Sequence, residues 1–189
     1  MNNLKIIAFV GMPGTGKDTC ANYLSEKYGW PVVHFGNMVY DEVKRRGLNN
    51  VKDEIFVRED MRKQEGLDVL AKQAARKAEK FASNGQHVII FDGLYSWSEY
   101  KYLEQTFGEN LIVIALAAPK KLRRQRVLDR QDGHRKYTID ELIKREVAEI
   151  ENIEKGGPIA YADYTIVNVG SPEQMLAKLN SILKEISLT

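Results

Sequence analysis

The sequence predicts an α/β fold, a doubly wound parallel sheet of five strands covered by helices on both faces. Three observations support this prediction. Five short apolar segments alternate with stretches of helical pattern, the first segment runs into a glycine-rich loop, and a helix start follows that loop at once. In such a fold, ligands bind at the carboxyl ends of the strands, and the glycine-rich loop lies at that edge.

The five strands are short, apolar and bounded by turn residues. They are expected over 4–10, 30–35, 87–91, 110–117 and 164–169. Only Lys5 interrupts the apolar run of the first strand, and the near-continuous apolar run over 87–91 is typical of a sheet that is covered on both faces. The third strand leads into Asp92 and Gly93, so it brings an acidic side chain to the ligand-binding edge of the sheet.

Helices fill the intervals between the strands. They are expected over 18–28, 38–46, 51–65, 67–82, 96–107, 119–131 and 138–154, with a last helix opening at 171–173. Gly29 is a stop signal for the first helix, and Thr138 opens a capping box. Two further interruptions are expected, a turn at Gly36-Asn37 and a break at 156–158.

Composition limits the kind of protein that this chain is. Its 189 residues are about the length of one domain. The net charge of +2 is too small to attract the whole protein to nucleic acid or to a membrane surface. No signal peptide is visible, and no apolar run approaches the ~18 residues of a membrane span. Cys20 is the one cysteine, which fits a reducing cytoplasm, and it is expected to pack in the core.

The stretch between the first strand and the first helix has the features of a phosphate-binding P-loop. Glycine permits the φ angles and close approach that a loop around phosphates requires, and the start of the helix adds unpaired N–H groups. A structural glycine turn is the alternative. The residues expected to hold a nucleotide here are Gly11, Met12, Pro13, Gly14, Thr15, Gly16, Lys17, Asp18 and Thr19.

Asp92 and Thr19 are the candidate metal contacts. A carboxylate at a strand end can bind Mg²⁺ directly or through water, although it can also simply cap the following turn. P-loops usually carry Ser or Thr directly after the lysine, but Asp18 stands there and Thr19 follows. Asp18 either assists the metal or caps the helix, where a carboxylate is favoured.

Several segments together resemble the nucleoside-monophosphate-kinase-like P-loop proteins. They are 11–19, 35–39, 92–94, Pro119 with Arg126 and Arg130, and 162–171. Residues 11–19 resemble the GxPGxGKGT loop of adenylate kinases, and residues 35–39 resemble the turn that opens their monophosphate-binding region. Residues 92–94 resemble their DGF motif, and Pro119, Arg126 and Arg130 resemble their lid hinge. Residues 162–171 resemble the end of dephospho-CoA kinases and of an adenylate-kinase-related archaeal group. The resemblance covers nearly the whole chain.

This resemblance implies the sheet order 2-3-1-4-5, with ATP and Mg²⁺ as cofactors. It implies one domain, 1–189, with a core of 1–35, 85–130 and 138–189, an acceptor-binding helical insert over 36–84 and a lid at about 131–137. The implied catalytic residues are Lys17, Asp92, Arg126 and Arg130. Arg126 is also expected to contact the nucleotide, and Asn168, Gly170 and Ser171 to border its adenine.

The acceptor half departs from the family pattern. Nucleotide kinases carry an arginine three residues after the aspartate of their turn and another in DGFPR, and both are missing here. Arg58 and Arg62, one helical turn apart, either replace those arginines or pair with neighbouring acids. The acceptor-binding candidates are Gly36, Asn37, Tyr40, Asp41, Arg58, Arg62, Gly93 and Tyr95.

Further basic residues surround the expected lid. Arg123, Arg126 and Arg130 lie on one side of a helix, where they either neutralise phosphate charge or form a solvated basic face. Arg135 and Arg145 are additional candidates for phosphate contact. The histidines in or beside apolar strands, His34 and His87, are expected to be structural.

Three functions are compatible with these features. The first is ATP-dependent phosphoryl transfer to a nucleotide or nucleotide-like small molecule. The second, motivated by the missing acceptor arginines, is a regulatory ATPase or switch with a protein partner. The third is a nucleic-acid end kinase, which the basic stretch 120–136 suggests and the low net charge opposes. We expect the first, in the cytoplasm, with no nucleic acid or membrane partner; the acceptor and the oligomeric state stay open.

Overall fold

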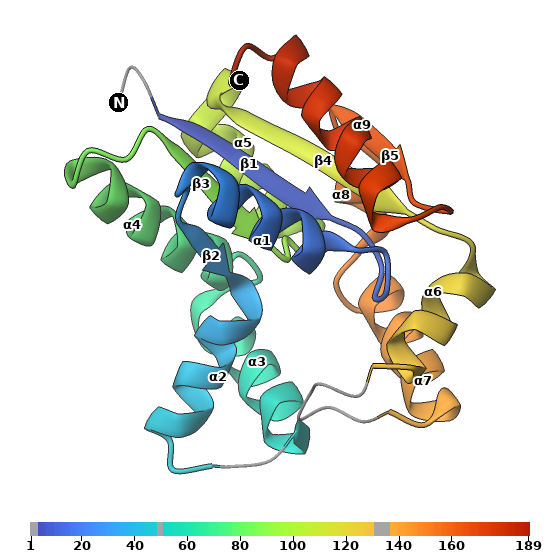
Figure 1. The fold of residues 1–189 in the computed structure, drawn as a ribbon. Helices are drawn as coiled ribbons and strands as arrows, with labels where there is room; N and C mark the ends of the chain where they lie inside the picture. The colour runs from blue at the N-terminus through green and yellow to red at the C-terminus, as the bar shows by residue number, and fades with distance from the viewer. Residues whose placement is uncertain (1–3, 49–50, 131–136) are drawn as a thin grey trace.

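The computed structural model describes residues 4–48, 51–130 and 137–189. Five parallel strands form one sheet in the order β2-β3-β1-β4-β5, which confirms the predicted fold class and strand order (Figure 1). The strands are β1 (Lys5–Val10), β2 (Val32–His34), β3 (Val88–Asp92), β4 (Leu111–Ala117) and β5 (Tyr164–Val167). The helices are α1 (Lys17–Tyr28), α2 (Phe35–Arg45), α3 (Val51–Glu65), α4 (Val69–Ser83), α5 (Trp97–Phe107), the 3₁₀ turn η1 (Gly108–Asn110), α6 (Lys120–Leu128), α7 (Ile139–Glu151), α8 (Gly156–Ala160) and α9 (Pro172–Glu185).

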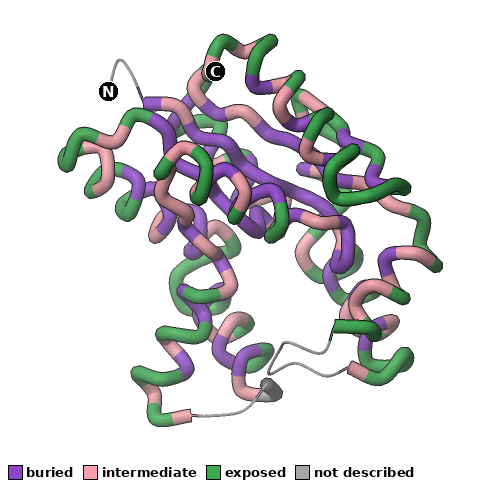
Figure 2. Tube along the Cα trace, in the orientation of Figure 1, coloured by how far each residue is buried: buried purple, intermediate pink, exposed green. Residues whose placement is uncertain are grey.

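Strand β1 lies at the centre of the sheet, between β3 and β4. Its apolar residues are fully buried on both faces, because successive side chains of a strand point to opposite sides. Ile6 and Ala8 belong to one core and Ile7 and Phe9 to the other. Figure 2 shows the resulting pattern, with buried strands inside and exposed outer helix surfaces.

Two helical layers enclose the sheet. Helices α1 and α9 pack on one face, where Cys20, Leu24 and Leu179 share a core with Ile7. Helices α4 and α5 cover the other face, where Leu70 and Leu103 are completely buried. The burial of Cys20 confirms its expected packing role, and burial raises the pKa of its thiol to about 12.

Two helix pairs project beyond the carboxyl ends of the strands, α2–α3 on one side and α6–α7 on the other (Figure 1). Glu146 of α7 joins the second pair, because it accepts hydrogen bonds from both Arg123 and Arg124 of α6. Arg123 is therefore engaged in a buried ion pair rather than free for a phosphate. We call this three-residue contact the α6–α7 clasp.

The structure corrects two local predictions. Gly36 and Asn37 form no turn; helix α2 begins at Phe35 and runs through both, since Gly36 has no positive φ to interrupt it. The expected break at 156–158 contains the short helix α8, which Pro158 enters without conflict because it stands in the first turn.

The predicted lid and the predicted division of the chain are not tested by the structure. The lid at about 131–137 falls almost entirely outside the described residues, and so does Arg135. The division into core, insert and lid therefore remains a prediction. Within the described part of the chain, none of the helices has the length and apolar character needed to cross a membrane.

Candidate functional site

The loop between β1 and α1 has a backbone that only glycine accommodates well. Gly16 caps α1 in a left-handed conformation with φ 101°, and Gly14 has φ 78°. A β-carbon on Gly14 would also collide with the backbone carbonyl of Arg123, at the start of α6. The glycines therefore let the loop adopt its shape and let α6 approach it closely.

Lys17 is buried at the first position of α1, below this loop. Its Nζ donates a hydrogen bond to the carbonyl of Met12 at 3.3 Å, so it lies under the loop's own backbone. Burial lowers the pKa of Lys17, and the nearby Asp92 and Asp18 oppose that effect. Such a lysine is placed to meet an anion that enters the loop.

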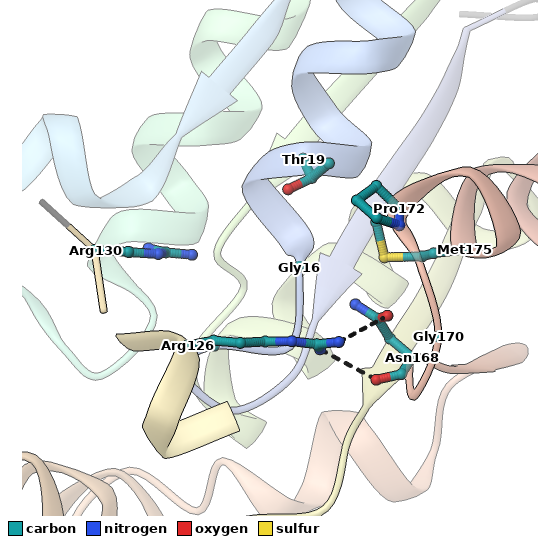
Figure 3. Close-up of a pocket in the computed structure, with 9 residues that line it drawn as sticks. Gly16, Thr19, Arg126, Arg130, Asn168, Gly170, Pro172 and Met175 are labelled. Carbon is teal, nitrogen blue, oxygen red and sulfur yellow. Dashed lines mark hydrogen bonds between the residues drawn. The ribbon is translucent and has the colours of Figure 1, made fainter. Parts of the chain in front are cut away.

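A pocket of about 270 Å³ adjoins the loop. It is lined by Gly14, Gly16, Thr19, Arg126, Arg130, Asn168, Gly170, Pro172 and Met175. Seven of these are predicted catalytic or nucleotide-binding residues, which the fold brings together from the β1–α1 loop, α1, α6 with the residues just after it, and the β5–α9 loop (Figure 3). Pro172 and Met175, on α9, were not expected there.

Asn168 connects the walls of this pocket. Its Nδ2 donates to the Thr15 carbonyl at 2.9 Å, and Arg126 donates to its carbonyl at 3.1 Å. Figure 3 shows the Arg126 side chain extending past Gly16 to reach Asn168. Ser171 does not line the pocket; its hydroxyl caps α9 by accepting from the Gln174 N–H.

Asp92 ends β3 beside the end of β2, where its neighbour in the sheet is His34. The Nδ1 of His34 lies 3.0 Å from Asp92 Oδ2, and this hydrogen bond raises the pKa of His34. The other carboxylate oxygen, Oδ1, is buried without a hydrogen-bond partner among the described residues. We expected a structural role for His34, whereas the structure places it beside Asp92 at the carboxyl edge of the sheet.

Asp18 and Arg130 form an ion pair at 3.4 Å between two largely exposed side chains. Such a pair contributes little to stability, so Arg130 remains available to a ligand. Thr19 is exposed and lines the pocket. The Thr15 hydroxyl, in contrast, donates a hydrogen bond to the Met12 carbonyl.

The acceptor candidates separate into two groups. Asn37, Tyr40 and Asp41 are exposed on α2, where the ammonium of Lys44 lies 4.6 Å from the Tyr40 ring centroid. Arg62 is buried and pairs with the fully buried Glu99 of α5, so the structure gives it an internal partner. Gly36 and Gly93 lie close to Tyr95, since a β-carbon on either would stand within 4 Å of its side chain.

Tyr95 is part of a charged cluster that includes Arg58, Arg145, Glu149 and Lys155. Glu149 of α7 accepts from Arg145 at 2.9 Å and from the buried Lys155 at 2.6 Å. Burial alone raises the pKa of Glu149, but Lys155 and Arg145 outweigh it and hold this pKa at about 2. The Lys155 ammonium and the Arg58 guanidinium lie 4.6 and 5.9 Å from the Tyr95 ring centroid.

Sequence reasoning missed Glu149 and Lys155. Neither belongs to a motif, and Lys155 stands in a loop after α7, where a lysine usually points to solvent. The Glu149–Arg145 spacing of one helical turn was the single available signal, and such pairs are common on exposed helix faces.

Comparison with known sequences identifies the family. The family model described as AAA domain matches residues 10–144. An Archaeoglobus fulgidus protein named "UPF0200/UPF0201 protein" is 32% identical over 97% of this chain, which spans 56% of that relative's length. A Thermoplasma acidophilum protein named "UPF0200 protein Ta0179" is 35% identical over 95% of this chain and 96% of its own.

Solved structures of low sequence identity share the fold. TT1252 from Thermus thermophilus has a TM-score of 0.67 at 19% identity, covering 97% of this chain and 98% of that one. A gluconokinase from Sinorhizobium meliloti has a TM-score of 0.59 at 13%, covering 98% and 97%, and a shikimate kinase from Aquifex aeolicus has 0.55 at 18%, covering 97% and 98%. With its phosphate-binding loop, its sheet order and its relatives, the chain belongs to the UPF0200 family and has a P-loop domain.

Proposed function

We propose that this protein transfers the γ-phosphoryl group of ATP to a small-molecule acceptor of nucleotide or nucleotide-like character. The observation that carries the proposal is that Lys17 lies beneath the P-loop near Asp92, whose Oδ1 at the end of β3 is buried without a hydrogen-bond partner among the described residues. A P-loop supports phosphate binding, and the fold is shared with proteins named as shikimate kinase and gluconokinase.

The residues present fit Mg²⁺ as a partner of the nucleotide. Asp92 Oδ1 is a buried acceptor without a partner among the described residues, and Mg²⁺ is typically held by one or two carboxylates together with substrate phosphates. Thr19 and Asp92 would hold it, with Asp18 beside them. When bound, Mg²⁺ neutralises charge on the phosphates.

The chain's own groups then perform the remaining tasks. The loop backbone and Lys17 hold the phosphates, and Arg126 and Arg130 add positive charge from the other side of the pocket. Phosphoryl transfer depends mainly on such positioning and electrostatic stabilisation. His34, bonded to Asp92, fixes the orientation of that carboxylate.

The test is acceptor-dependent ADP release. The panel contains nucleoside monophosphates and dephospho-CoA, with shikimate and gluconate added because proteins named for those substrates share the fold. We expect at least one acceptor to raise turnover above the level with ATP alone. Lys17→Ala should reduce that turnover by roughly 100-fold or more, since it removes a charge that faces the phosphates.

Lys77→Ala is the matched control, because Lys77 is exposed on α4, far from the loop in sequence and outside the pocket. If no acceptor raises turnover while slow ATP hydrolysis persists and depends on Lys17, the kinase proposal fails and the regulatory ATPase is favoured. If turnover survives Lys17→Ala, the activity does not come from this site.

A further inference from the structure

The cluster around Tyr95 contains more cations than carboxylates. Arg145 and Lys155 share one carboxylate, Glu149, so the three groups together carry an excess positive charge. Arg58 adds another cation and forms no ion pair with a residue of the described chain; its guanidinium rests near the Tyr95 ring instead. Within the described part of the chain, Arg58 is therefore the cation of this cluster that no carboxylate pairs, while Arg145 shares its carboxylate with Lys155.

This excess is costly to the folded protein. Burial lowers the pKa of Arg58, and repulsion from Arg62 and Arg145 lowers it further, whereas Tyr95 and Glu149 act in the opposite direction without restoring the usual pKa. A partly buried cation without a partner destabilises the fold, and proteins retain such groups mainly at functional sites. An anion supplied from solution would remove the penalty.

A ligand can reach the relevant groups. The Arg145 side chain is 26% exposed, and Arg58 and Tyr95 are half-buried, whereas Glu149 and Lys155 are almost fully buried. Arg58 and Arg145 are thus the reachable cations, and Glu149 with Lys155 forms their support. Arg145 also donates to the Tyr137 hydroxyl at 2.8 Å, which fixes its orientation.

The cluster lies beside the P-loop rather than remote from it. Burial lowers the pKa of Lys155 to about 7, and the charge of Lys17 contributes to that shift. Arg145 and Glu149 in turn act on the pKa of Lys17. Gly93, which directly follows Asp92, has φ 97°, and a β-carbon there would press on the Tyr95 ring at 3.2 Å. A molecule held by Arg58 and Arg145 would therefore be near the transferred phosphoryl group.

We propose that Arg58 and Arg145 bind an oxyanion of the phosphoryl acceptor, a carboxylate or a phosphate, with Tyr95 against the same molecule. The guanidinium fork matches the geometry of both oxyanions. This proposal rests on the proposed function and specifies its substrate class: the acceptor is an anionic small molecule. It also assigns the task of the missing family arginines to a different set of residues, contributed by α3 and α7.

The experiment uses the full chain saturated with ADP and Mg²⁺, so that the P-loop is occupied before any other anion is added. Phenyl phosphate, benzoate and uncharged benzyl alcohol are titrated by isothermal calorimetry. We expect saturable binding of at least one of the two anions and none of benzyl alcohol. The stronger of the two anions tells whether the acceptor carries a phosphate or a carboxylate.

Arg58→Gln and Arg145→Gln should each weaken anion binding by about tenfold or more, as expected for loss of a charge-assisted contact. Arg76→Gln is the matched control, because Arg76 is exposed on α4 outside the cluster. Arg145→Lys keeps the positive charge beside Glu149, and it replaces Arg145→Gln in the anion titration if that variant fails to fold. Equal anion affinities in Arg58→Gln and Arg76→Gln would overturn the proposal.

The melting temperature without ligand gives a second, independent readout. Arg58→Gln removes an unpaired and partly buried charge, so it should melt at a higher temperature than the parent. A purely structural role for Arg58 predicts the opposite sign. If the parent protein does not bind ADP, the proposed function itself is refuted. If it binds ADP but none of the anions, only the oxyanion site is refuted.

Discussion

At the scale of single residues, loss of the Glu149 carboxylate should strongly destabilise the protein. Its carboxylate is the shared partner of Arg145 and Lys155, and Lys155 is 1% exposed. Glu149→Gln leaves both cations unpaired, so we expect a loss of about 3–5 kcal/mol in the free energy of unfolding. Urea denaturation measures it, and Glu151→Gln, exposed on the same helix, should change stability little.

The same carboxylate predicts how stability depends on pH. The pKa of Glu149 is held at about 2, below the usual 4.5, so its stabilising effect is complete above 4.5 and disappears as pH falls toward 2. Tyr95, Lys17 and the two paired cations also face this region. Acid unfolding curves of the parent should therefore fall more steeply than those of Glu149→Gln; identical slopes would contradict this assignment.

Asp92 gives a prediction of the opposite kind, a loss of function with little loss of stability. Asparagine has the same shape and can still bond His34, but it lacks the charge at the orphaned Oδ1. We expect Asp92→Asn to reduce acceptor-dependent turnover by about 100-fold while metal-free nucleotide binding persists. Turnover assays and fluorescent-nucleotide titrations test this, with the exposed Asp140→Asn as control.

At the scale of elements, the P-loop and α6 are fitted to each other through Gly14. A methyl group there would meet the Arg123 carbonyl and would also strain a left-handed backbone. Gly14→Ala should therefore displace α6, which carries Arg126, and abolish tight nucleotide binding. Gly29→Ala is the control, because its φ is 69° but nothing lies within 4 Å, so only about 1 kcal/mol of backbone strain is expected.

At the scale of the whole molecule, a ligand that binds only the folded state raises the melting temperature. Nucleotide at 100 times its dissociation constant should stabilise the protein by about 2.7 kcal/mol. For a chain of this size, that corresponds to a shift of roughly 5–10 °C in a calorimetric scan. The shift should vanish in Lys17→Ala; a similar shift in that variant would place the nucleotide elsewhere.

The sequence was informative wherever the relevant residues are neighbours in the chain. The P-loop, the apolar strands and the capping box at Thr138 each lie within a few residues, so local spacing revealed them. The cluster around Tyr95 is different, because α3, the β3–α5 loop and α7 contribute to it from positions far apart in the chain. No local pattern marks Lys155 as buried, and no spacing rule indicates that Arg62 would pair with Glu99.

The turn expected at Gly36-Asn37 failed for a related reason. Glycine and asparagine favour turns locally, but α2 buries Phe35, Met38 and Val39 against the sheet and the neighbouring helices. That burial stabilises a continuous helix from the end of β2, so tertiary packing overrides the local preference of glycine and asparagine for a turn.

The α6–α7 clasp connects the two proposed binding sites, so we expect binding at one site to affect binding at the other. Helix α6 carries Arg126 in the wall of the pocket beside the P-loop, α7 carries Arg145 of the proposed oxyanion site, and Glu146 joins the two helices. Any factor by which nucleotide tightens anion binding must equal the factor by which the anion tightens nucleotide binding. Calorimetric titrations in both orders should give that one number, and Glu146→Gln should bring it toward unity.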